Sequence, residues 1–432
     1  MKIYNSTDFN KTYLDILKDL MNKPMYKVTN RKGETLHEIT NFNLVLSDLN
    51  KCYCFCRNLN LHYLIGELLF YLKGENKLEN IEYYSKFWKR ISDDEINLNS
   101  CYGYYIWKQP LNHIKVNQYR YCLHQLLRNK ESKKAVITIY SAVHHSKETK
   151  DNPCTMFLQF YIRENKLYLK THMRSNDIWF GLPYDLPFFV MLQKMMYIDL
   201  KNQTIYDNLE LGDYIHSSNS LHLYEKDFKA VSDVIKKPYK EILLPEFTQI
   251  SYSQLNSLID FENVLKDNCF INPTLYNEDY FIKFFKKILL NFKMFNELKN
   301  YAEEKSTCLK KKVACYFLNS DLNVITKGYN GRPNIMVGCT ECVAKKEEFF
   351  HDTCNSLHAE ERAILELSKQ GYNVYKLKNT TCYLTHAPCD QCLKFMIELG
   401  VKKVIFKEPY KTHYERYKGL IEIEDGFGRK YV

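Results

Sequence analysis

The sequence predicts an α/β protein with more than one domain, and three observations support that prediction. A chain of 432 residues is longer than a single hydrophobic core usually organises. From Met1 to about Pro245, apolar strand-like runs alternate with runs of helical periodicity, as in an α/β or α+β enzyme. From Thr307, short strands and amphipathic helices alternate, which predicts a small α/β/α sandwich.

The first part of the chain shows both periodicities. Helices are expected where apolar residues recur at three- and four-residue spacing, and strands where short apolar runs are rich in β-branched and aromatic residues. The helical patterns include residues 62–74 and 188–200, and the strand patterns include 135–140 and 155–162. We assign residues 1–245 to this first domain.

A stretch rich in Asn, Lys, Phe and Tyr follows the first domain. Residues 246–300 have helical periodicity, clearest from Tyr280 onward, but no site chemistry, so we interpret them as a helical connector. Residues 301–432 form the last domain. Its expected elements are strands at 312–319 and 324–330, a helix at 358–371, a strand at 381–386, a helix at 389–400 and a strand at 401–406.

Composition limits the class of protein. The net charge of +10 comes from 61 basic and 51 acidic residues spread along the chain, which suits small anionic ligands as well as nucleic acid. No apolar run approaches the length of a membrane span and the N-terminus lacks a secretory signal, so we expect a cytoplasmic protein without a membrane partner. In that reducing compartment, the 15 cysteines are expected to be metal ligands, a nucleophile or buried thiols.

The strongest chemical signal is the segment HAE followed by PCDQC near the C-terminus. One imidazole and two thiolates leave a fourth position of zinc open for water, so we expect His358, Cys389 and Cys392 to hold a catalytic Zn²⁺. Both cysteines fall in the first turn of a helix after a proline, where the helix dipole favours thiolates. Glu360 is expected to move protons without binding the metal. The pattern is a signature of zinc deaminases that act on cytosine or adenine.

Four further soft ligands precede this helix. Cys339 and Cys342 form one close pair, and His351 and Cys354 form another. Two such pairs suit a closed tetrahedral site, so we expect a second, structural Zn²⁺ that orders the segment instead of reacting. Unbound buried thiols are the alternative.

The segments TKGYNGRPNIMVGC and HDTCNSLHAEERAI extend the pattern over roughly Thr307 to Tyr410. This part of the chain resembles the deoxycytidylate deaminase family, in which a GYNG-P loop precedes the catalytic helix. The resemblance implies a cytidine deaminase-like sandwich and a nucleotide contact for Asn330. Arg362 departs from the family, which has an asparagine there. An arginine could grip a phosphate or exclude the usual ligand pose.

In the first domain, NPCTMFLQFYI and RSNDIWFGLPYD contain a further group of reactive residue types. Cys154 opens a strand, Arg174 and Ser175 end the next one, and Asp185 closes a glycine-proline turn. With RKGET, GELLFYLKGEN, CYGYYIW and SLHLY in the same order, these segments resemble the thymidylate synthase and deoxycytidylate hydroxymethylase family across nearly all of residues 1–245. The resemblance implies a thymidylate synthase-like α+β domain, a homodimer, and one-carbon transfer to pyrimidine C5 from 5,10-methylenetetrahydrofolate.

The same resemblance implies roles for individual residues. Cys154 is the implied nucleophile, because pyrimidine C5 reacts only after a thiolate adds to C6, and the nearby arginine is expected to depress its pKa. The other implied site residues are Glu67 for proton transfer through water, Tyr102 near the reacting ring, Asp177 at the folate ring, Arg31, Lys133, Lys134, Arg174 and Ser175 at the phosphate, and His222 with Tyr224 at the deoxyribose hydroxyl.

The sequence departs from the synthase pattern at three places. Thr155 follows the nucleophile where a histidine is usual, and Lys133 with Lys134 replaces an arginine pair, which loses the bidentate fork. Asp185 replaces an asparagine. A carboxyl group accepts from the cytosine amino group and, when protonated, donates to N3, whereas a carboxylate would set oxygen against oxygen on uracil. We therefore expect Asp185 to prefer cytosine and the product to be 5-hydroxymethyl-dCMP.

Two reaction orders fit two such sites. In one, dCMP is hydroxymethylated, and dCMP or its product is deaminated. In the other, dCMP is deaminated to dUMP and then methylated to dTMP. Asp185 favours the first order. A nucleic-acid cytidine deaminase would share the zinc signature, but the nucleotide-processing partner domain argues against it. The expected ligands are therefore pyrimidine deoxynucleoside monophosphates and folate, and nucleic acid is not expected.

Overall fold

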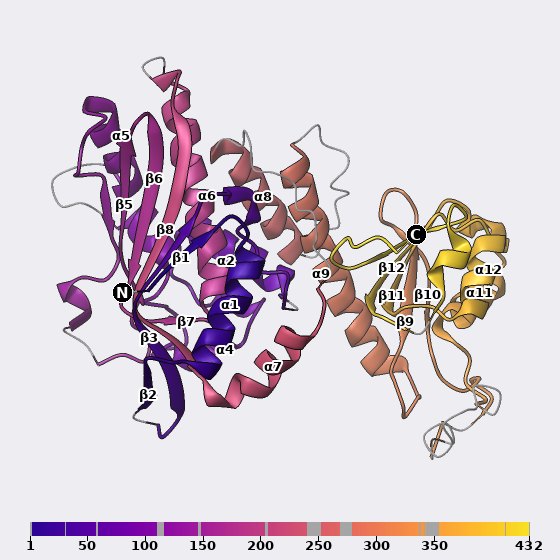
Figure 1. The fold of residues 1–432 in the computed structure, drawn as a ribbon. Coiled ribbons are helices and arrows are strands. Elements are labelled where there is room, and N and C mark those ends of the chain that lie inside the picture. The colour runs from indigo at the N-terminus through magenta and orange to yellow at the C-terminus, as the bar shows by residue number, and fades with distance from the viewer. Residues whose placement is uncertain are drawn as a thin grey trace. The chain divides into compact units, whose positions relative to one another are not determined.

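The computed structural model describes residues 2–30, 32–57, 59–109, 116–145, 148–203, 206–239, 252–267, 279–336, 338–340, 342, 354–410 and 412–431. The chain divides into two compact units, Met1–Ile259 and Asp260–Val432, each described by itself (Figure 1). Each unit has its own sheet with helices, so the predicted α/β fold is confirmed. The domain bounds at 245 and 300 stay predictions. Among the described residues, no helix is both long and apolar enough to cross a membrane.

The N-terminal unit is built on an eight-stranded sheet. Its path runs β1-β3-β8-β6-β5-β4, with β2 paired to β3 and β7 paired to β8. The long β8 lies antiparallel to β3 and parallel to both β6 and β7. The strands are β1 (Lys2–Ser6), β2 (Tyr26–Thr29), β3 (Thr35–Leu46), β4 (Val136–Thr138), β5 (Thr155–Arg163), β6 (Lys166–Met173), β7 (Asn176–Asp177) and β8 (Glu210–Tyr224). The pairing of β7 with β8 brings Asp177 beside His222.

Helices surround this sheet, and α2 carries an acidic residue into the core. Helix α2 is apolar on nearly every side and is buried accordingly, with Glu67 in its middle. It begins after Asn60, whose side chain accepts the N–H of Tyr63 at 3.1 Å, and ends at Gly74 in the left-handed region (φ 65°). The helices are α1 (Phe9–Asn22), α2 (Leu61–Lys73), α3 (Glu79–Glu82), α4 (Phe87–Ile91), α5 (Gln118–Arg128), α6 (Leu182–Lys201) and α7 (Phe228–Lys236), with short helical turns η1 (Leu49–Lys51), η2 (Tyr104–Lys108), η3 (Ala142–His145) and η5 (Glu225–Asp227).

The turn expected to close at Asp185 is instead the first turn of α6. Pro183 occupies the second helical position, where its missing N–H costs no hydrogen bond and its fixed φ suits a helix. The helix therefore starts before Asp185, and it continues through Pro187. The prediction of a turn was wrong because a glycine-proline pair marks a helix start as readily as a turn.

The C-terminal unit is a three-layer sandwich. Its sheet has the order β10-β9-β11-β12-β13, in which β11, β12 and β13 run parallel and β9 pairs antiparallel with β10 and β11. Figure 1 shows α11 and α12 on one face of this sheet and α9 on the other, which confirms the predicted α/β/α arrangement. The elements are α9 (Tyr280–Lys305), β9 (Ala314–Leu318), β10 (Val324–Tyr329), α11 (Ala359–Lys369), η7 (Val374–Leu377), β11 (Thr381–His386), α12 (Asp390–Glu398), β12 (Lys403–Glu408), η8 (Tyr414–Tyr417) and β13 (Glu422–Asp425).

Helix α9 includes much of the stretch interpreted as a connector, and it follows α8 (Tyr252–Lys266) in the chain. It contacts β9 and β11 directly. Its fully buried Asn291 donates to the carbonyl of Gly426 at 3.0 Å and accepts the hydroxyl of Tyr383 at 3.0 Å. Helix α9 is therefore one layer of the C-terminal sandwich as well as a link along the chain.

Replacing Asn291 should destabilise the C-terminal unit. Asn291→Ala leaves a buried hydroxyl and a buried carbonyl without partners, which costs about 1–3 kcal/mol of unfolding free energy. Urea denaturation followed by hydrogen exchange of β9 and β11 measures this loss. Tryptophan fluorescence should barely change, because Trp88, Trp107 and Trp179 are the only tryptophans and all lie in the N-terminal unit. The control is Asn300→Ala, an exposed residue of the same helix; equal effects of the two substitutions would contradict the role of Asn291.

Candidate active sites

Three predicted metal ligands meet at the ends of two helices in the C-terminal unit. His358 is the cap residue of α11, Cys389 is the cap residue of α12, and Cys392 lies in the first turn of α12. Their ligand atoms all lie within 4.8 Å of one another. His358 Nδ1 is 3.3 Å from the Cys392 sulfur and 3.5 Å from the Cys389 sulfur. The backbone N–H of His358 donates to Glu361 at 2.8 Å, which holds the imidazole at the helix start.

These three groups share protons, and their pKa values shift accordingly. The pKa of Cys389 falls to about 4, mainly because the Cys392 thiol donates to its sulfur. The hydrogen bond to that sulfur raises the pKa of His358 to about 9. The pKa of Cys392 rises, chiefly because its thiol donates to Cys389. The expectation of two thiolates thus holds for Cys389 alone, because two neighbouring anions are unfavourable without a cation between them. One nitrogen and two sulfurs at this separation fit Zn²⁺.

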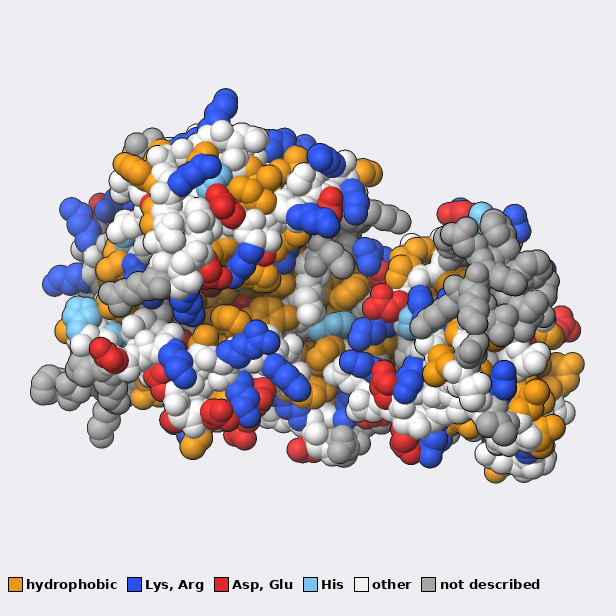
Figure 2. All heavy atoms as spheres, turned by 90° about the horizontal axis from the view of Figure 1, so that it is seen from below, with side chains coloured by type: hydrophobic (Ala, Val, Ile, Leu, Met, Phe, Trp, Pro, Cys, Tyr) orange, Lys and Arg blue, Asp and Glu red, His pale blue; other side chains and the backbone are white. Residues whose placement is uncertain are grey.

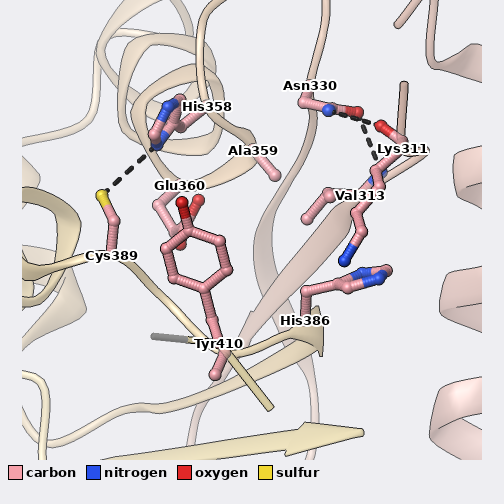
Figure 3. A pocket seen from close by; sticks show the side chains of 10 residues that line it. Lys311, Val313, Asn330, His358, Ala359, Glu360, His386, Cys389 and Tyr410 are labelled. Carbon is pink, nitrogen blue, oxygen red and sulfur yellow. Dashed lines mark hydrogen bonds between the residues drawn. The ribbon is translucent and has the colours of Figure 1, made fainter. Parts of the chain in front are cut away.

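Glu360 lies beside this cluster in a small cavity. The cavity has a volume of about 140 Å³ and is lined by Lys311, Val313, Asn330, His358, Ala359, Glu360, His386, Ala387, Cys389 and Tyr410 (Figure 3). Glu360 is 5% exposed, and burial raises its pKa to about 7. A carboxyl group with that pKa gains and loses a proton readily near neutral pH, which is what general acid-base chemistry requires.

The opposite side of the cavity carries polar groups that sequence reasoning did not single out. Figure 3 shows the amino group of Lys311 directed toward the ring of His386. Burial, followed by the charge of Lys311, lowers the pKa of His386. No sequence motif marks Lys311, His386 or Tyr410; each comes from a different segment, and only the fold brings them to one cavity.

The predicted nucleotide contact Asn330 lines the same cavity, but its amide already holds the chain. Its Nδ2 donates to the carbonyl of Lys311 at 2.8 Å, and its Oδ1 accepts from Ser306 at 2.6 Å and from the backbone N–H of Val313 at 2.8 Å. Asn330 therefore orders the segment that carries Lys311.

Arg362 does not point into the cavity. It is 3% exposed, and its guanidinium donates to the carbonyls of Tyr329, Gly331 and Arg332 and to the side chain of Asn334, at 2.8–3.0 Å. It also stacks over the ring of Tyr329 at 4.4 Å. The idea that Arg362 grips a phosphate or excludes a ligand is wrong for this structure, because all four bonds go to the loop 329–334. Arg362 fixes that loop on α11.

The second predicted zinc site stays a prediction. His351 lies outside the described residues. Cys339 and Cys342 are half-buried and Cys354 is exposed, and these three join no metal-sized cluster among the described residues.

In the N-terminal unit, the predicted nucleophile Cys154 lies on the loop before β5. Arg174 donates its guanidinium N–H groups to the carbonyls of Pro153 at 3.0 Å and Asn152 at 3.1 Å, and its backbone N–H donates to Cys154 at 2.9 Å. Arg174 is thus tied to the segment that carries the thiol.

The depressed pKa expected for Cys154 is not found. Burial raises the pKa of this thiol, and the charge of Arg174, which lowers it, is opposed by three carboxylates. The acidic residues are Asp185, Asp151 and Asp177. The expectation was wrong because a sequence shows the arginine beside the cysteine but not the burial and the acids around it.

Two buried carboxyl groups lie close to one another in this unit. Burial, and then the charge of Asp185, raise the pKa of Glu67 to about 8. Burial also raises the pKa of Asp185 to about 7. The charges of Asp185 and Cys154 both act on the buried hydroxyl of Tyr102, so the predicted set Glu67, Tyr102, Cys154 and Asp185 is brought together.

Tyr63 is a site residue that the sequence analysis missed. Its hydroxyl donates to Glu67 Oε1 at 2.7 Å and accepts the indole N–H of Trp88 at 3.0 Å, while Glu67 Oε2 is buried without a hydrogen bond. The four-residue spacing of Tyr63 and Glu67 on one helix was an available signal.

The remaining predicted residues lie nearby or at the surface. Asp177 Oδ1 accepts the backbone N–H groups of Trp179 at 2.7 Å and Phe180 at 3.1 Å. His222 is buried, its Nδ1 has no partner among the described residues, and its ring packs edge-on against Tyr224 at 5.3 Å. Ser175 is half-buried, and Arg174, Lys133 and Lys134 are exposed. Arg31 lies outside the described residues.

Figure 2 shows that the N-terminal unit is hollowed on one face. Hydrophobic side chains line the floor of the hollow, and Lys and Arg side chains gather along its rim. An apolar floor with a charged rim is typical of a pocket for an anionic ligand with a flat apolar part.

Comparison with known proteins matches both units. A family model described as "Thymidylate synthase" matches residues 11–267, and one described as "Cytidine and deoxycytidylate deaminase zinc-binding region" matches residues 291–408. The thymidylate synthase of Vesicomyosocius okutanii subsp. Calyptogena okutanii (strain HA) is 25% identical over 237 residues, which cover 54% of this chain and 86% of that protein. The solved structure of thermostable thymidylate synthase A from Bacillus subtilis is 22% identical with a TM-score of 0.44, over 54% of this chain and 86% of that one.

Removing one sulfur from the cluster should remove one metal ion. In Cys389→Ser the cluster keeps one nitrogen and one sulfur, so we expect the zinc content of the purified chain to fall by about one ion per chain, as one ligand set holds one ion. Inductively coupled plasma mass spectrometry measures this content. Cys308→Ser is the control, since Cys308 is a half-buried cysteine of the same unit outside the cluster. An unchanged zinc content in Cys389→Ser would contradict the assignment.

Proposed function

Since this chain belongs to the thymidylate synthase family and also carries a cytidine and deoxycytidylate deaminase zinc-binding region, we propose that it is a bifunctional enzyme of pyrimidine deoxynucleoside monophosphates. In the N-terminal unit, dCMP receives a one-carbon unit at C5 and becomes 5-hydroxymethyl-dCMP. In the C-terminal unit, dCMP or this product loses its amino group. The observation that carries the choice of dCMP is the buried carboxyl group of Asp185.

The state of Asp185 supports cytosine as the base. Its pKa of about 7 means that the carboxyl group keeps a proton over part of the neutral range. A neutral carboxyl group has one donor and one acceptor, which match the N3 acceptor and the amino donor of cytosine. A site built around such a pair discriminates strongly, because the wrong base leaves buried polar groups unpaired.

The other residues of the N-terminal unit have roles that follow from their positions. Cys154 adds to C6 of the pyrimidine and so makes C5 nucleophilic. Arg174 holds the segment of Cys154 and faces the substrate phosphate. Glu67 holds a proton near neutral pH, because its pKa is about 8, and exchanges it with the ring or with water.

The folate donor fits the residues present in one respect. Asp177 is fixed by two backbone N–H groups, so its carboxylate is preoriented for the N–H donors of a pterin ring. When bound, methylenetetrahydrofolate would supply the one-carbon unit for C5.

In the C-terminal unit, the donor set of His358, Cys389 and Cys392 fits zinc. When bound, zinc would lower the pKa of a water molecule for attack on C4 of cytosine. Glu360 holds the proton that N3 accepts and later delivers a proton to the departing ammonia. Lys311 and His386 lie at the other side of the cavity, where they suit the anionic end of a nucleotide.

A second candidate is deamination of dCMP to dUMP followed by methylation to dTMP. One observation favours it: a neutral carboxyl group at Asp185 can also donate to O4 of uracil and accept from its N3–H. The two orders differ in which base the N-terminal unit takes, so a direct comparison of dCMP and dUMP decides between them.

The two activities should be separable by single substitutions. Cys154→Ala removes the nucleophile and should abolish one-carbon transfer while deamination continues. Glu360→Gln removes the proton carrier and should slow deamination by roughly 10²–10⁴-fold while one-carbon transfer continues. Mass spectrometry of the products of dCMP with methylenetetrahydrofolate measures both activities at once. Loss of both activities in either variant, or conversion of single-stranded DNA alone, would contradict two separate mononucleotide sites.

Asp185→Asn should change the preferred base. An amide matches uracil, so the ratio of kcat/KM for dCMP to that for dUMP should fall by roughly a hundredfold or more. The assay is run in a Glu360→Gln background, so that dCMP is not deaminated during the measurement.

The same comparison has a pH dependence. Binding of dCMP to Asp185 requires the neutral acid, which predominates below pH about 7 and is lost as pH rises above it, since the pKa is raised to about 7. The affinity for dCMP should therefore weaken above pH 7 in the parent and not in Asp185→Asn, which also controls for ionisation of the phosphate. A base preference unchanged by Asp185→Asn would refute this role.

A further inference from the structure

A chain of buried polar side chains lies behind Asp185. It consists of Tyr214 and His216 on β8 and Asn176 on β7, and it ends at Asp185 on α6. Tyr214 and His216 are 0% exposed, Asn176 is 2% exposed and Asp185 is 7% exposed. Polar groups buried this deeply are retained only when their hydrogen bonds are made.

The bonds run in one direction along the chain. The Tyr214 hydroxyl is 2.9 Å from His216 Nδ1, His216 Nε2 is 3.2 Å from Asn176 Oδ1, and Asn176 Nδ2 donates to Asp185 Oδ2 at 2.9 Å. None of these residues is a predicted site residue except Asp185.

The imidazole has a single N–H to give. Burial lowers the pKa of His216 to about 3, so the ring is neutral. Asn176 Oδ1 can only accept, so the ring proton must be on Nε2, and Nδ1 then accepts from Tyr214. The amide of Asn176 therefore turns its NH₂ group toward Asp185.

This orientation affects the proton of the carboxyl group. Oδ2 is an acceptor for Asn176, so the proton of the neutral acid is favoured on Oδ1. The two placements of that proton present opposite orders of donor and acceptor to positions 3 and 4 of a pyrimidine. One order matches cytosine and the other matches uracil.

We propose that Tyr214, His216 and Asn176 are positioning residues that keep the proton of Asp185 on Oδ1 and so make the choice of base a property of the whole buried chain. The inference rests on the proposed function, in that a pyrimidine must lie against Asp185. It adds that a carboxyl group alone would accept either base, and that the residues behind it decide between them.

Base choice is measured by binding to the full-length chain. All three tryptophans lie in the N-terminal unit, so quenching of tryptophan fluorescence by dCMP and by dUMP reports on that unit alone. Every variant carries Glu360→Gln to prevent deamination. In Asn176→Val, the ratio of the two dissociation constants should move toward one by about tenfold, because losing one buried hydrogen bond costs about 1–2 kcal/mol.

Two further variants keep the test interpretable. Tyr214→Phe removes one oxygen at the far end of the chain and should move the ratio in the same direction by a smaller factor; this variant carries the test if Asn176→Val does not fold. Ser217→Ala is the matched control, because Ser217 is a buried neighbour of His216 that bonds to Asn43 at 2.8 Å, outside the chain of bonds. It should leave the ratio unchanged. An unchanged ratio in folded Asn176→Val and Tyr214→Phe would overturn the proposal.

The tautomer of His216 is an independent readout. Nitrogen NMR of the chain labelled at histidine should show one neutral ring protonated at Nε2, identified by its absence in His216→Gln. A ring protonated at Nδ1, or an imidazolium at pH 7, would overturn the proposal even if the base ratio shifts.

The proposed function is judged separately, by turnover. If neither nucleotide receives a one-carbon unit although both bind, the proposed function fails, while the tautomer and the binding ratio still decide the role of the buried chain. If neither nucleotide binds to the N-terminal unit, both fail.

Discussion

Burial of acidic side chains is the constraint on which both candidate sites depend. A carboxyl group with an ordinary pKa of about 4 is ionised at neutral pH and can only accept hydrogen bonds. In this chain, burial raises the pKa of Glu67 to about 8 and the pKa values of Asp185 and Glu360 to about 7. Each of these groups can hold a proton at neutral pH and give it up to a partner. The hydrophobic cores therefore do chemical work as well as stabilise the fold.

The C-terminal unit places its metal ligands by starting two helices at one point. His358 and Cys389 are both cap residues, so their side chains lie where each helix leaves backbone N–H groups unpaired. Arg362, one turn further along α11, binds the loop that also carries Asn330. The ligand helix and the loop that lines the cavity are thus parts of one rigid assembly, and a loop movement would strain four hydrogen bonds.

The N-terminal unit uses hydrogen bonds to hold its reactive groups before a ligand arrives. Arg174 binds the segment of Cys154 through two backbone carbonyls, and Tyr63 fixes one oxygen of Glu67. The thiol itself is protonated at rest, since burial raises its pKa and three nearby acids oppose the arginine. A substrate that displaces water and adds its own charges changes each of these balances.

The sequence by itself determined the fold class, the two kinds of unit, the long helix from Tyr280, and the cluster of His358, Cys389 and Cys392. These features depend on short-range spacing, because helical periodicity and ligand spacing are written in neighbouring residues. Only the tertiary structure decided that Asp185 starts a helix, that Arg362 faces a loop, and that Cys154 has a raised pKa. It alone joined Tyr214, His216 and Asn176 to Asp185. Burial and hydrogen-bond partners depend on segments far apart in the chain, and a linear pattern contains neither the desolvation nor the contacts that set a proton's position.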